Sequence, residues 1–243
     1  MSAIVVGASA GLGRALACEL AARGCDLVLV ASDYRDVEAL GADLALRHGV
    51  STRAVGLDLA RDADPGARIV ASLTGFPAPT ALLLAAGESR GDDDFSLGAA
   101  AIGHLLAVNL HAPLAIVHAL LQALLETRGT IVLCGSIAAI RGRGRNVAYA
   151  AAKRALESVY ESLRQRYRPR ELRVQCYRLG FLATNLTWGR RLPLGAAEPA
   201  AVARRIVRRL RGRSGFFTAP RRFVLLAAIA RWLPWPLYRR LRD

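Results

Sequence analysis

The sequence is poor in several residue types, and each shortage excludes a class of protein. Its four cysteines, Cys18, Cys25, Cys134 and Cys176, form no C-x-x-C pair and have no histidines at zinc-ligand spacing. We therefore expect no disulfide framework and no metal site, and a reducing compartment. The first residues lead directly into an apolar strand pattern instead of a basic leader with a cleavage site. A removed targeting segment is therefore not expected.

Long apolar runs are also lacking. None reaches the ~20 residues that cross a bilayer, and the longest run in the tail extends from Phe223 to Ala230. We expect a cytoplasmic protein that is soluble or lies on a membrane surface without spanning it. Hydrophobic residues nevertheless make up 53% of the 243 residues, which excludes a disordered chain and suits one domain.

Lysine is almost absent, and acidic residues are outnumbered. Lys153 is the one lysine among 34 basic residues, which face 19 acidic ones and give a formal charge of +15. Residues 199–243 hold twelve arginines and one acidic residue, so much of the excess lies there. Such a segment predicts an anionic partner: a lipid surface, a phosphorylated substrate or nucleic acid. Because no nucleic-acid-binding motif accompanies it, we do not expect nucleic acid.

Short apolar runs alternate with helical patterns along the chain. Strands are expected at residues 3–6, 26–31, 52–57, 81–86, 130–134, 172–177 and 216–218, and helices at 12–23, 36–48, 97–126 and 147–168. Continuous apolar strands separated by helices predict an α/β fold: a single doubly wound, Rossmann-type parallel sheet of about seven strands with helices on both faces. We expect residues 1–198 to form the dinucleotide-binding and catalytic part. Residues 199–243 should be a basic amphipathic extension that completes the same domain.

A glycine-rich turn follows the first expected strand. Gly7, Gly11 and Gly13 have the spacing G-x-x-x-G-x-G. Glycines let backbone N–H groups approach a pyrophosphate, and the next helix adds the positive end of its dipole. The turn therefore predicts a dinucleotide site, and a tight turn without a ligand is the weaker alternative.

The residues after the second and third strands bear on the choice of cofactor. Ser32 or Arg35 can receive the 2′-phosphate of NADPH, whereas Asp33 lies slightly late for binding the ribose hydroxyls of NADH. The sequence therefore leaves both NADH and NADPH open. Asp58 is placed either to bind the adenine amino group or to cap its own loop.

Tyr149 and Lys153 stand four residues apart on the last of the expected helices. Positions i and i+4 share a helix face, so the phenol and the ammonium should point into one crevice. A nearby cation lowers the pKa of a phenol from its usual ~10 toward the working range. Ser136 lies just past the fifth strand, where it can hold a carbonyl oxygen. Asn109 lies among apolar residues, where its amide needs a partner.

With these motifs the sequence resembles the short-chain dehydrogenase/reductase family over nearly its whole length. The resemblance implies an NAD(P)H-dependent carbonyl reductase in which Tyr149 donates a proton to the substrate oxygen and Ser136 orients the carbonyl. It implies that Lys153 lowers the pKa of Tyr149 and binds the nicotinamide ribose. Asn109 would hold a water that links Lys153 to solvent. The implied cofactor contacts are Gly7, Ser9, Gly11, Leu12, Gly13, Ser32, Asp58, Leu59, Ala86, Gly87, Tyr149, Lys153, Gly180 and Thr184.

Two further regions bear on the substrate. Arg141, Arg143 and Arg145 precede Tyr149 and can bind a phosphate, although a solvated loop fits them equally well. Trp188 lies in the other region, residues 181–199. In the tail, residues 201–213 have the pattern of a basic amphipathic helix. The aromatic and basic residues after it are typical of a membrane interface, and packing on the core or on a partner subunit is the alternative.

The tail and the arginine-rich loop resemble those of a subgroup of the family that reduces a 2-keto sugar carried on decaprenyl phosphate. This resemblance implies a polyprenyl-phosphoryl keto-sugar as substrate, an oxidase partner that supplies the ketone, and peripheral attachment to the inner face of the cytoplasmic membrane. A reductase for a soluble ketone, acyl or steroid-like compound and a dinucleotide-binding regulator are the alternatives. Relatives use the two long helices to assemble, so we expect a homodimer or homotetramer.

Overall fold

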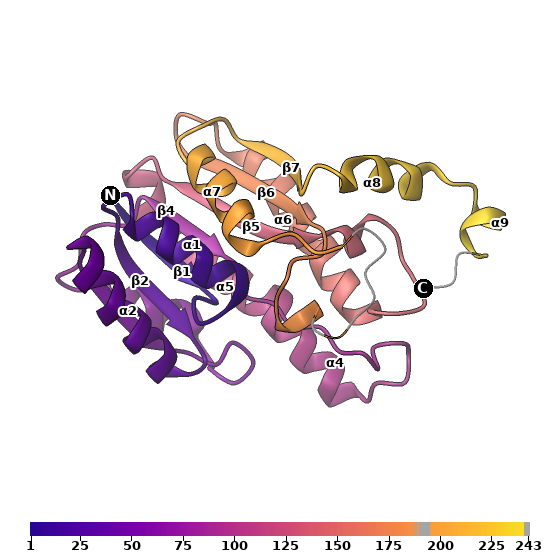
Figure 1. Cartoon of the computed structure of the whole chain (residues 1–243), viewed down its shortest axis with the longest axis horizontal. Helices are drawn as coiled ribbons and strands as arrows, with labels where there is room; N and C mark the ends of the chain where they lie inside the picture. The colour runs from indigo at the N-terminus through magenta and orange to yellow at the C-terminus, as the bar shows by residue number, and fades with distance from the viewer. Residues whose placement is uncertain (188, 190–194, 241–243) are drawn as a thin grey trace.

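A parallel β-sheet forms the centre of the molecule (Figure 1). The computed structural model describes residues 1–187, 189 and 195–240, and within them seven strands pair in the order β3-β2-β1-β4-β5-β6-β7. Val5 pairs with Leu29 on one side and Leu83 on the other. The expected doubly wound α/β fold is confirmed. The strands are β1 (Ser2–Val6), β2 (Asp26–Ala31), β3 (Thr52–Gly56), β4 (Ala81–Leu84), β5 (Thr130–Ser136), β6 (Arg173–Leu179) and β7 (Gly215–Ala219).

Alternate residues of each strand enter two separate hydrophobic clusters. Val5 belongs to the cluster under α1 (Gly11–Ala21), α2 (Tyr34–His48) and α7 (Pro199–Arg209). Its neighbour Ile4 belongs to the opposite cluster, under α3 (Pro65–Ala71), α5 (Ala112–Glu126) and α6 (Val147–Arg166). Because helices cover both faces, the strands need apolar residues at successive positions, which explains their unbroken apolar pattern.

The helix expected over residues 97–126 is divided by a π-helical turn. It consists of α4 (Ala99–Leu106), the turn η1 (Ala107–His111) and α5. Contrary to expectation, this run is long and apolar enough to cross a bilayer by length and hydropathy. However, Leu105, Ile116 and Leu120 are fully buried. Apolar residues of this run therefore pack inside the protein, and Ile116 and Leu120 belong to the cluster against the sheet.

Helix α3 has no counterpart among the expected elements. The Asp64 side chain accepts a hydrogen bond from the Ala67 N–H at 2.8 Å, and Pro65 begins the helix. Both features are typical of helix starts. The helix has only seven residues, too few for an apolar period to stand out.

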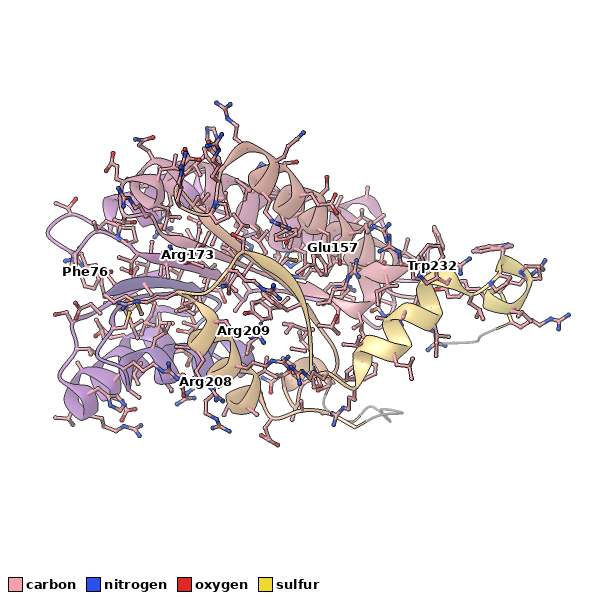
Figure 2. The ribbon with its side chains drawn as sticks, turned by 90° about the horizontal axis from the view of Figure 1, so that it is seen from above. Phe76, Glu157, Arg173, Arg208, Arg209 and Trp232 are labelled. Atoms are coloured by element: carbon pink, nitrogen blue, oxygen red, sulfur yellow. The ribbon has the colours of Figure 1, made fainter. Side chains whose placement is uncertain are left out.

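The C-terminal residues divide into two parts. In α7, Val202 and Ile206 are buried in the core, so this basic amphipathic helix packs on the protein itself, and β7 completes the edge of the sheet. The following helices α8 (Phe223–Trp232) and α9 (Trp235–Tyr238) extend away from the body (Figure 1). Figure 2 shows Trp232 on α8, with α9 farther from the body. We call α8 and α9 the C-terminal arm.

Candidate active site

Close backbone contacts require glycine at two positions of the turn between β1 and α1. Gly7 has a φ of +86°, and a Cβ on it would lie 2.7 Å from the Ala86 Cα. A Cβ on Gly13 would lie 1.8 Å from the Gly7 carbonyl oxygen. Only glycine fits at either position. Within described residues 10–21, the start of α1 has no side-chain cap and no acidic residue in its first turn, so its N–H groups are available to an anion.

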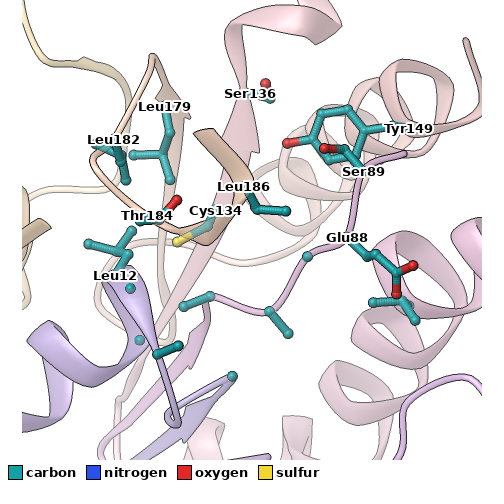
Figure 3. Close-up of a pocket in the computed structure, with 18 of the residues that line it drawn as sticks. Leu12, Glu88, Ser89, Cys134, Ser136, Tyr149, Leu179, Leu182, Thr184 and Leu186 are labelled. Carbon is teal, nitrogen blue, oxygen red and sulfur yellow. The ribbon is translucent and has the colours of Figure 1, made fainter. Parts of the chain in front are cut away.

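A cavity of about 570 Å³ lies at the carboxyl ends of the strands, a usual size for a small-molecule site. It lies where the strand order reverses between β1 and β4. In Figure 3, Leu12 and Thr184 lie on one side of it, and Tyr149 and Glu88 on the other. The structure brings all the positions expected to contact the cofactor to this cavity: Gly7, Ser9, Gly11, Leu12, Gly13, Ser32, Asp58, Leu59, Ala86, Gly87, Tyr149, Lys153, Gly180 and Thr184.

At the end of β2, only one of the three candidate residues reaches the cavity. Ser32 lines it. Asp33 instead caps α2 by accepting from the Arg35 N–H at 3.0 Å, and its carboxylate pairs with the Arg35 guanidinium at 3.1 Å. Asp58 lines the cavity and also accepts from the Ala60 N–H at 2.9 Å. Both interpretations of Asp58, ligand contact and loop cap, are therefore compatible with its position.

The three polar side chains expected to act on the substrate come from β5 and α6. Ser136 ends β5, and Tyr149 and Lys153 lie on the first turns of α6; all three line the cavity. Lys153 is 3% exposed, and its Nζ donates to the carbonyl oxygens of Cys134 at 3.2 Å and Ala86 at 3.4 Å. The ammonium is thus fixed 5.8 Å from the centre of the Tyr149 ring.

Burial controls the proton equilibria of this group. It raises the pKa of the Tyr149 phenol, and the hydrogen bond with the Ser136 side chain and the positive charge of Arg143 oppose that rise. Burial also lowers the pKa of the Lys153 ammonium to about 8. Ser136 and Arg143 thus lower the pKa of Tyr149 against the effect of burial, and the same effect expected of Lys153 stays a prediction. The phenol is therefore protonated at neutral pH, which is the form that donates a proton.

Asn109 lies in the turn η1 and is fully buried. Its Nδ2 donates to the carbonyl oxygens of Glu88 at 2.8 Å and Leu105 at 2.9 Å, and its Oδ1 accepts from the Glu88 N–H at 3.2 Å. A Cβ on Gly87 would lie 3.1 Å from the Lys153 Nζ and 3.2 Å from the Asn109 Oδ1. Asn109 thus fixes the loop after β4 beside Lys153, as π-helical turns often do at functional sites. The water implied by the family resemblance stays a prediction.

Asp93 is a site residue that the sequence analysis missed. It is 2% exposed, and its two carboxylate oxygens accept from the N–H groups of Ala148 and Tyr149, each at 3.0 Å. Its own carbonyl accepts from the Val147 N–H at 3.2 Å. Asp93 therefore caps the helix that carries the phenol. It stands second in a run of three aspartates, where no pattern distinguishes it from its neighbours.

The arginines expected to bind the substrate separate in the structure. Arg143 lines the cavity, whereas Arg145 is exposed and is not among the described lining residues. Arg141 is held by backbone carbonyl oxygens of the arm, and its guanidinium carbon lies 4.1 Å from the Tyr238 ring centre. Of the three expected arginines, Arg143 is therefore the one that the structure places at the cavity. Trp188 lies outside the described residues.

The residues present fit a nicotinamide dinucleotide. Gly7, Gly11 and Gly13 line the cavity without side chains, and the N–H groups at the start of α1 are available beside them. When bound, the reduced nicotinamide supplies a hydride. Tyr149 holds a proton for the oxygen of a bound carbonyl compound, Ser136 can orient that oxygen, and Lys153 places a charge beside both.

Comparisons with known proteins agree with this geometry. The family model described as short chain dehydrogenase matches residues 1–193. An uncharacterized oxidoreductase of Myxococcus xanthus is 32% identical over 195 residues, which cover 79% of this chain and 76% of that protein. The 3-oxoacyl-acyl-carrier-protein reductase of Escherichia coli is 27% identical over 186 residues, 76% of this chain and 75% of that protein.

A solved structure is similar over the full length. The short-chain dehydrogenase from Sphingobium yanoikuyae in complex with NADPH superposes with a TM-score of 0.82 at 25% identity, covering 100% of this chain and 96% of the other. The chain belongs to the short-chain dehydrogenase family and is an NAD(P)-dependent oxidoreductase that acts on CH–OH and C=O groups.

Proposed function

We propose that this chain uses NADPH to reduce a keto-sugar carried on a polyprenyl phosphate, while attached to the inner face of the cytoplasmic membrane. The observation that carries the proposal is the position of the arm. The arm follows β7, and because all strands are parallel, it leaves the sheet at the carboxyl ends of the strands, where the cavity lies. A prenyl chain held in lipid beside the arm would bring its sugar to the same end of the sheet.

The chemistry of the arm favours an anionic lipid surface. Its side chains expose apolar and aromatic area that a water-facing helix would not carry: Leu225 is 70% exposed, Trp232 79% and Trp235 61%. Exposed Arg231 lies on α8, and exposed Arg222 and Arg239 lie directly before α8 and directly after α9. Aromatic, apolar and basic side chains in one segment suit the membrane interface. Three such arginines contribute about 3 kcal/mol near an anionic leaflet, roughly a hundredfold in affinity.

The cavity supports a phosphorylated substrate. Arg143 lines it together with Tyr149 and Ser136, so a phosphate bound by the guanidinium would lie in the same cavity as the proton donor. The arm and this loop resemble those of decaprenylphosphoryl-2-keto-ribose reductases. An oxidase acting on the corresponding alcohol would supply the ketone.

The preference for NADPH rests on the end of β2. Asp33, which could have bound the ribose hydroxyls of NADH, is engaged in capping α2 and in its pair with Arg35. Ser32 is a polar residue at this end of β2 that lines the cavity, and its hydroxyl can donate to a 2′-phosphate.

The outer face of the helical run 99–126 suits assembly with a second copy of the chain. Ile102, Leu106 and Leu114 on this face are 38%, 36% and 44% exposed, more apolar area than a solvated helix face needs. We include a homodimer or homotetramer in the proposal. The molar mass in solution tests it.

The experiment that tests the proposed function compares two substrates. NADPH oxidation is followed with decaprenylphosphoryl-2-keto-ribose in vesicles of phosphatidylcholine and phosphatidylglycerol, and with the same keto-sugar phosphate without its prenyl chain. We expect turnover of the first and a far lower kcat/KM for the second. Equal kcat/KM values, or no turnover of the prenyl substrate, would contradict the proposal.

A second candidate substrate class is a 3-oxoacyl thioester. It is favoured by the similarity to the Escherichia coli reductase, whose name gives that activity to that protein. A 3-oxoacyl thioester offered in the same assay separates the two candidates, because only one of them should be reduced efficiently.

A further inference from the structure

Arg141 is held almost entirely by the C-terminal arm. Its Nη1 donates to the carbonyl oxygen of Ala230 at 3.3 Å and to that of Leu233. Its guanidinium carbon lies 4.1 Å from the ring centre of Tyr238 and 5.5 Å from that of Trp235. Both distances are within cation–π range. The side chain therefore joins the end of α8 to α9.

Two further contacts connect the arm to the crevice. The Tyr238 hydroxyl donates to the Gly142 carbonyl oxygen at 2.9 Å, next to Arg141. At the base of the arm, the Phe223 ring covers Gly180, where a Cβ would lie 2.3 Å from the ring, and packs against Phe181 with ring centres 5.6 Å apart. Gly180 and Phe181 line the cavity. The arm thus touches cavity-lining residues at its base and the loop after β5 at its end.

The same loop supplies a cavity residue two positions later. Arg143 lines the cavity with Tyr149. Two residues of extended chain span only about 7 Å, so the backbone at Arg141 and the backbone at Arg143 cannot move independently over larger distances. The loop then enters α6 through Asn146, whose φ of +55° is uncommon for a residue other than glycine.

We propose that Arg141 couples the arm to the active-site loop, so that lipid contact by α8 and α9 holds Arg143 in the crevice. Arg141 is a positioning residue in this scheme: it touches neither cofactor nor substrate. Lipid fixes the arm, the arm fixes Arg141, and the loop then has fewer conformations in which Arg143 is away from the substrate. The inference rests on the proposed lipid contact of the arm. It adds that this contact fixes the position of Arg143 in the crevice.

The first test needs no substrate. Hydrogen exchange of residues 141–147 is measured in the NADPH-bound protein with and without vesicles of phosphatidylcholine and phosphatidylglycerol. The Arg141 guanidinium donates hydrogen bonds to the carbonyl oxygens of Ala230 and Leu233. If lipid stabilises these two bonds, exchange in the wild type should be about tenfold slower with vesicles than without them. The variant Arg141→Gln should bind the vesicles without this protection. Arg145→Gln, a neighbour that does not line the cavity, is the matched control and should behave like the wild type.

The second test uses the proposed prenyl substrate. Arg141→Gln should raise KM about tenfold with kcat nearly unchanged, Tyr238→Phe should raise it less, and Arg145→Gln not at all. A wild type without vesicle-induced protection, or an Arg141→Gln protein that keeps wild-type protection and KM, overturns the coupling. If the wild type does not turn over the prenyl substrate, the proposed function fails, while the exchange measurement still decides the coupling.

Discussion

Replacement of Asp93 by asparagine tests how the phenol is held in place. The Asp93 carboxylate accepts from the N–H groups of Ala148 and Tyr149 at 3.0 Å each, in a position that is 2% exposed. Within the described chain, Asn146 provides no side-chain cap for α6. Asparagine has nearly the same volume, but it keeps only one acceptor oxygen and turns an NH₂ group toward the second N–H.

The magnitude follows from these contacts. One N–H left unpaired in a buried position costs about 1–3 kcal/mol, and loss of the negative charge at the helix N-terminus adds about 0.3–1 kcal/mol. We therefore expect Asp93→Asn to lower the free energy of unfolding by about 2–3 kcal/mol, a fall in Tm of roughly 4–12 °C for a chain of this size. Because the first turn carries Tyr149, kcat should fall by about 10- to 100-fold.

The assay compares thermal unfolding, NADPH affinity and kcat for Asp93→Asn and Asp94→Asn. Asp94 is exposed, and its carboxylate accepts from the Ser96 N–H at 3.3 Å without capping α6, so its variant should lie within about 0.5 kcal/mol of the wild type. NADPH affinity should be unchanged in both, since the glycine turn belongs to other elements. An Asp93→Asn protein with wild-type Tm and kcat would refute the positioning role.

Three further predictions concern cofactor binding, pH and stability. In Gly13→Ala, the new Cβ would lie 1.8 Å from a carbonyl oxygen of the turn, so NADPH binding measured by fluorescence should be lost; unchanged binding would contradict the geometry. Because burial lowers the pKa of Lys153 to about 8, the ammonium loses its proton as pH rises through that value. The kcat/KM for reduction should therefore decline above it, whereas Lys153→Arg should give a flat profile at a lower rate. Buried Glu157 and partly buried Arg178 form a bidentate pair with distances of 2.6 and 2.5 Å, so Glu157→Gln should cost about 3 kcal/mol in urea unfolding, and a loss below about 1 kcal/mol would show that the pair is dispensable.

The sequence predicts those parts of the molecule in which neighbouring residues carry the signal. Residues 26–31 form a strand with the expected bounds because burial on both faces leaves an uninterrupted apolar run. Tyr149 and Lys153 meet in the crevice because their spacing equals one helical turn. The glycine turn is recognised from its local spacing, although only Gly13 is required by a contact within the turn; a Cβ on Gly7 would meet Ala86, and one on Gly11 would meet Thr184.

Contacts between distant segments could not be predicted in the same way. Asp93 caps a helix that begins more than fifty residues later, and Arg141 binds an arm about ninety residues away. Asp93 stands between two other aspartates, and Arg141 is one of three arginines in its loop, so residue type does not distinguish either of them. The effect of Arg143 on Tyr149 depends likewise on how the loop folds over the cavity, which spacing along the chain does not reveal.

The central claim is that the Tyr149 phenol donates the proton to a carbonyl oxygen beside the bound nicotinamide. The most direct test is Tyr149→Phe, which removes one oxygen atom from the cavity lining. NADPH affinity and kcat are measured on the same preparation, with a carbonyl compound that the wild type reduces. The account predicts unchanged NADPH affinity and a kcat lower by about 10²- to 10⁴-fold. A variant that binds NADPH and keeps a kcat close to that of the wild type would contradict it.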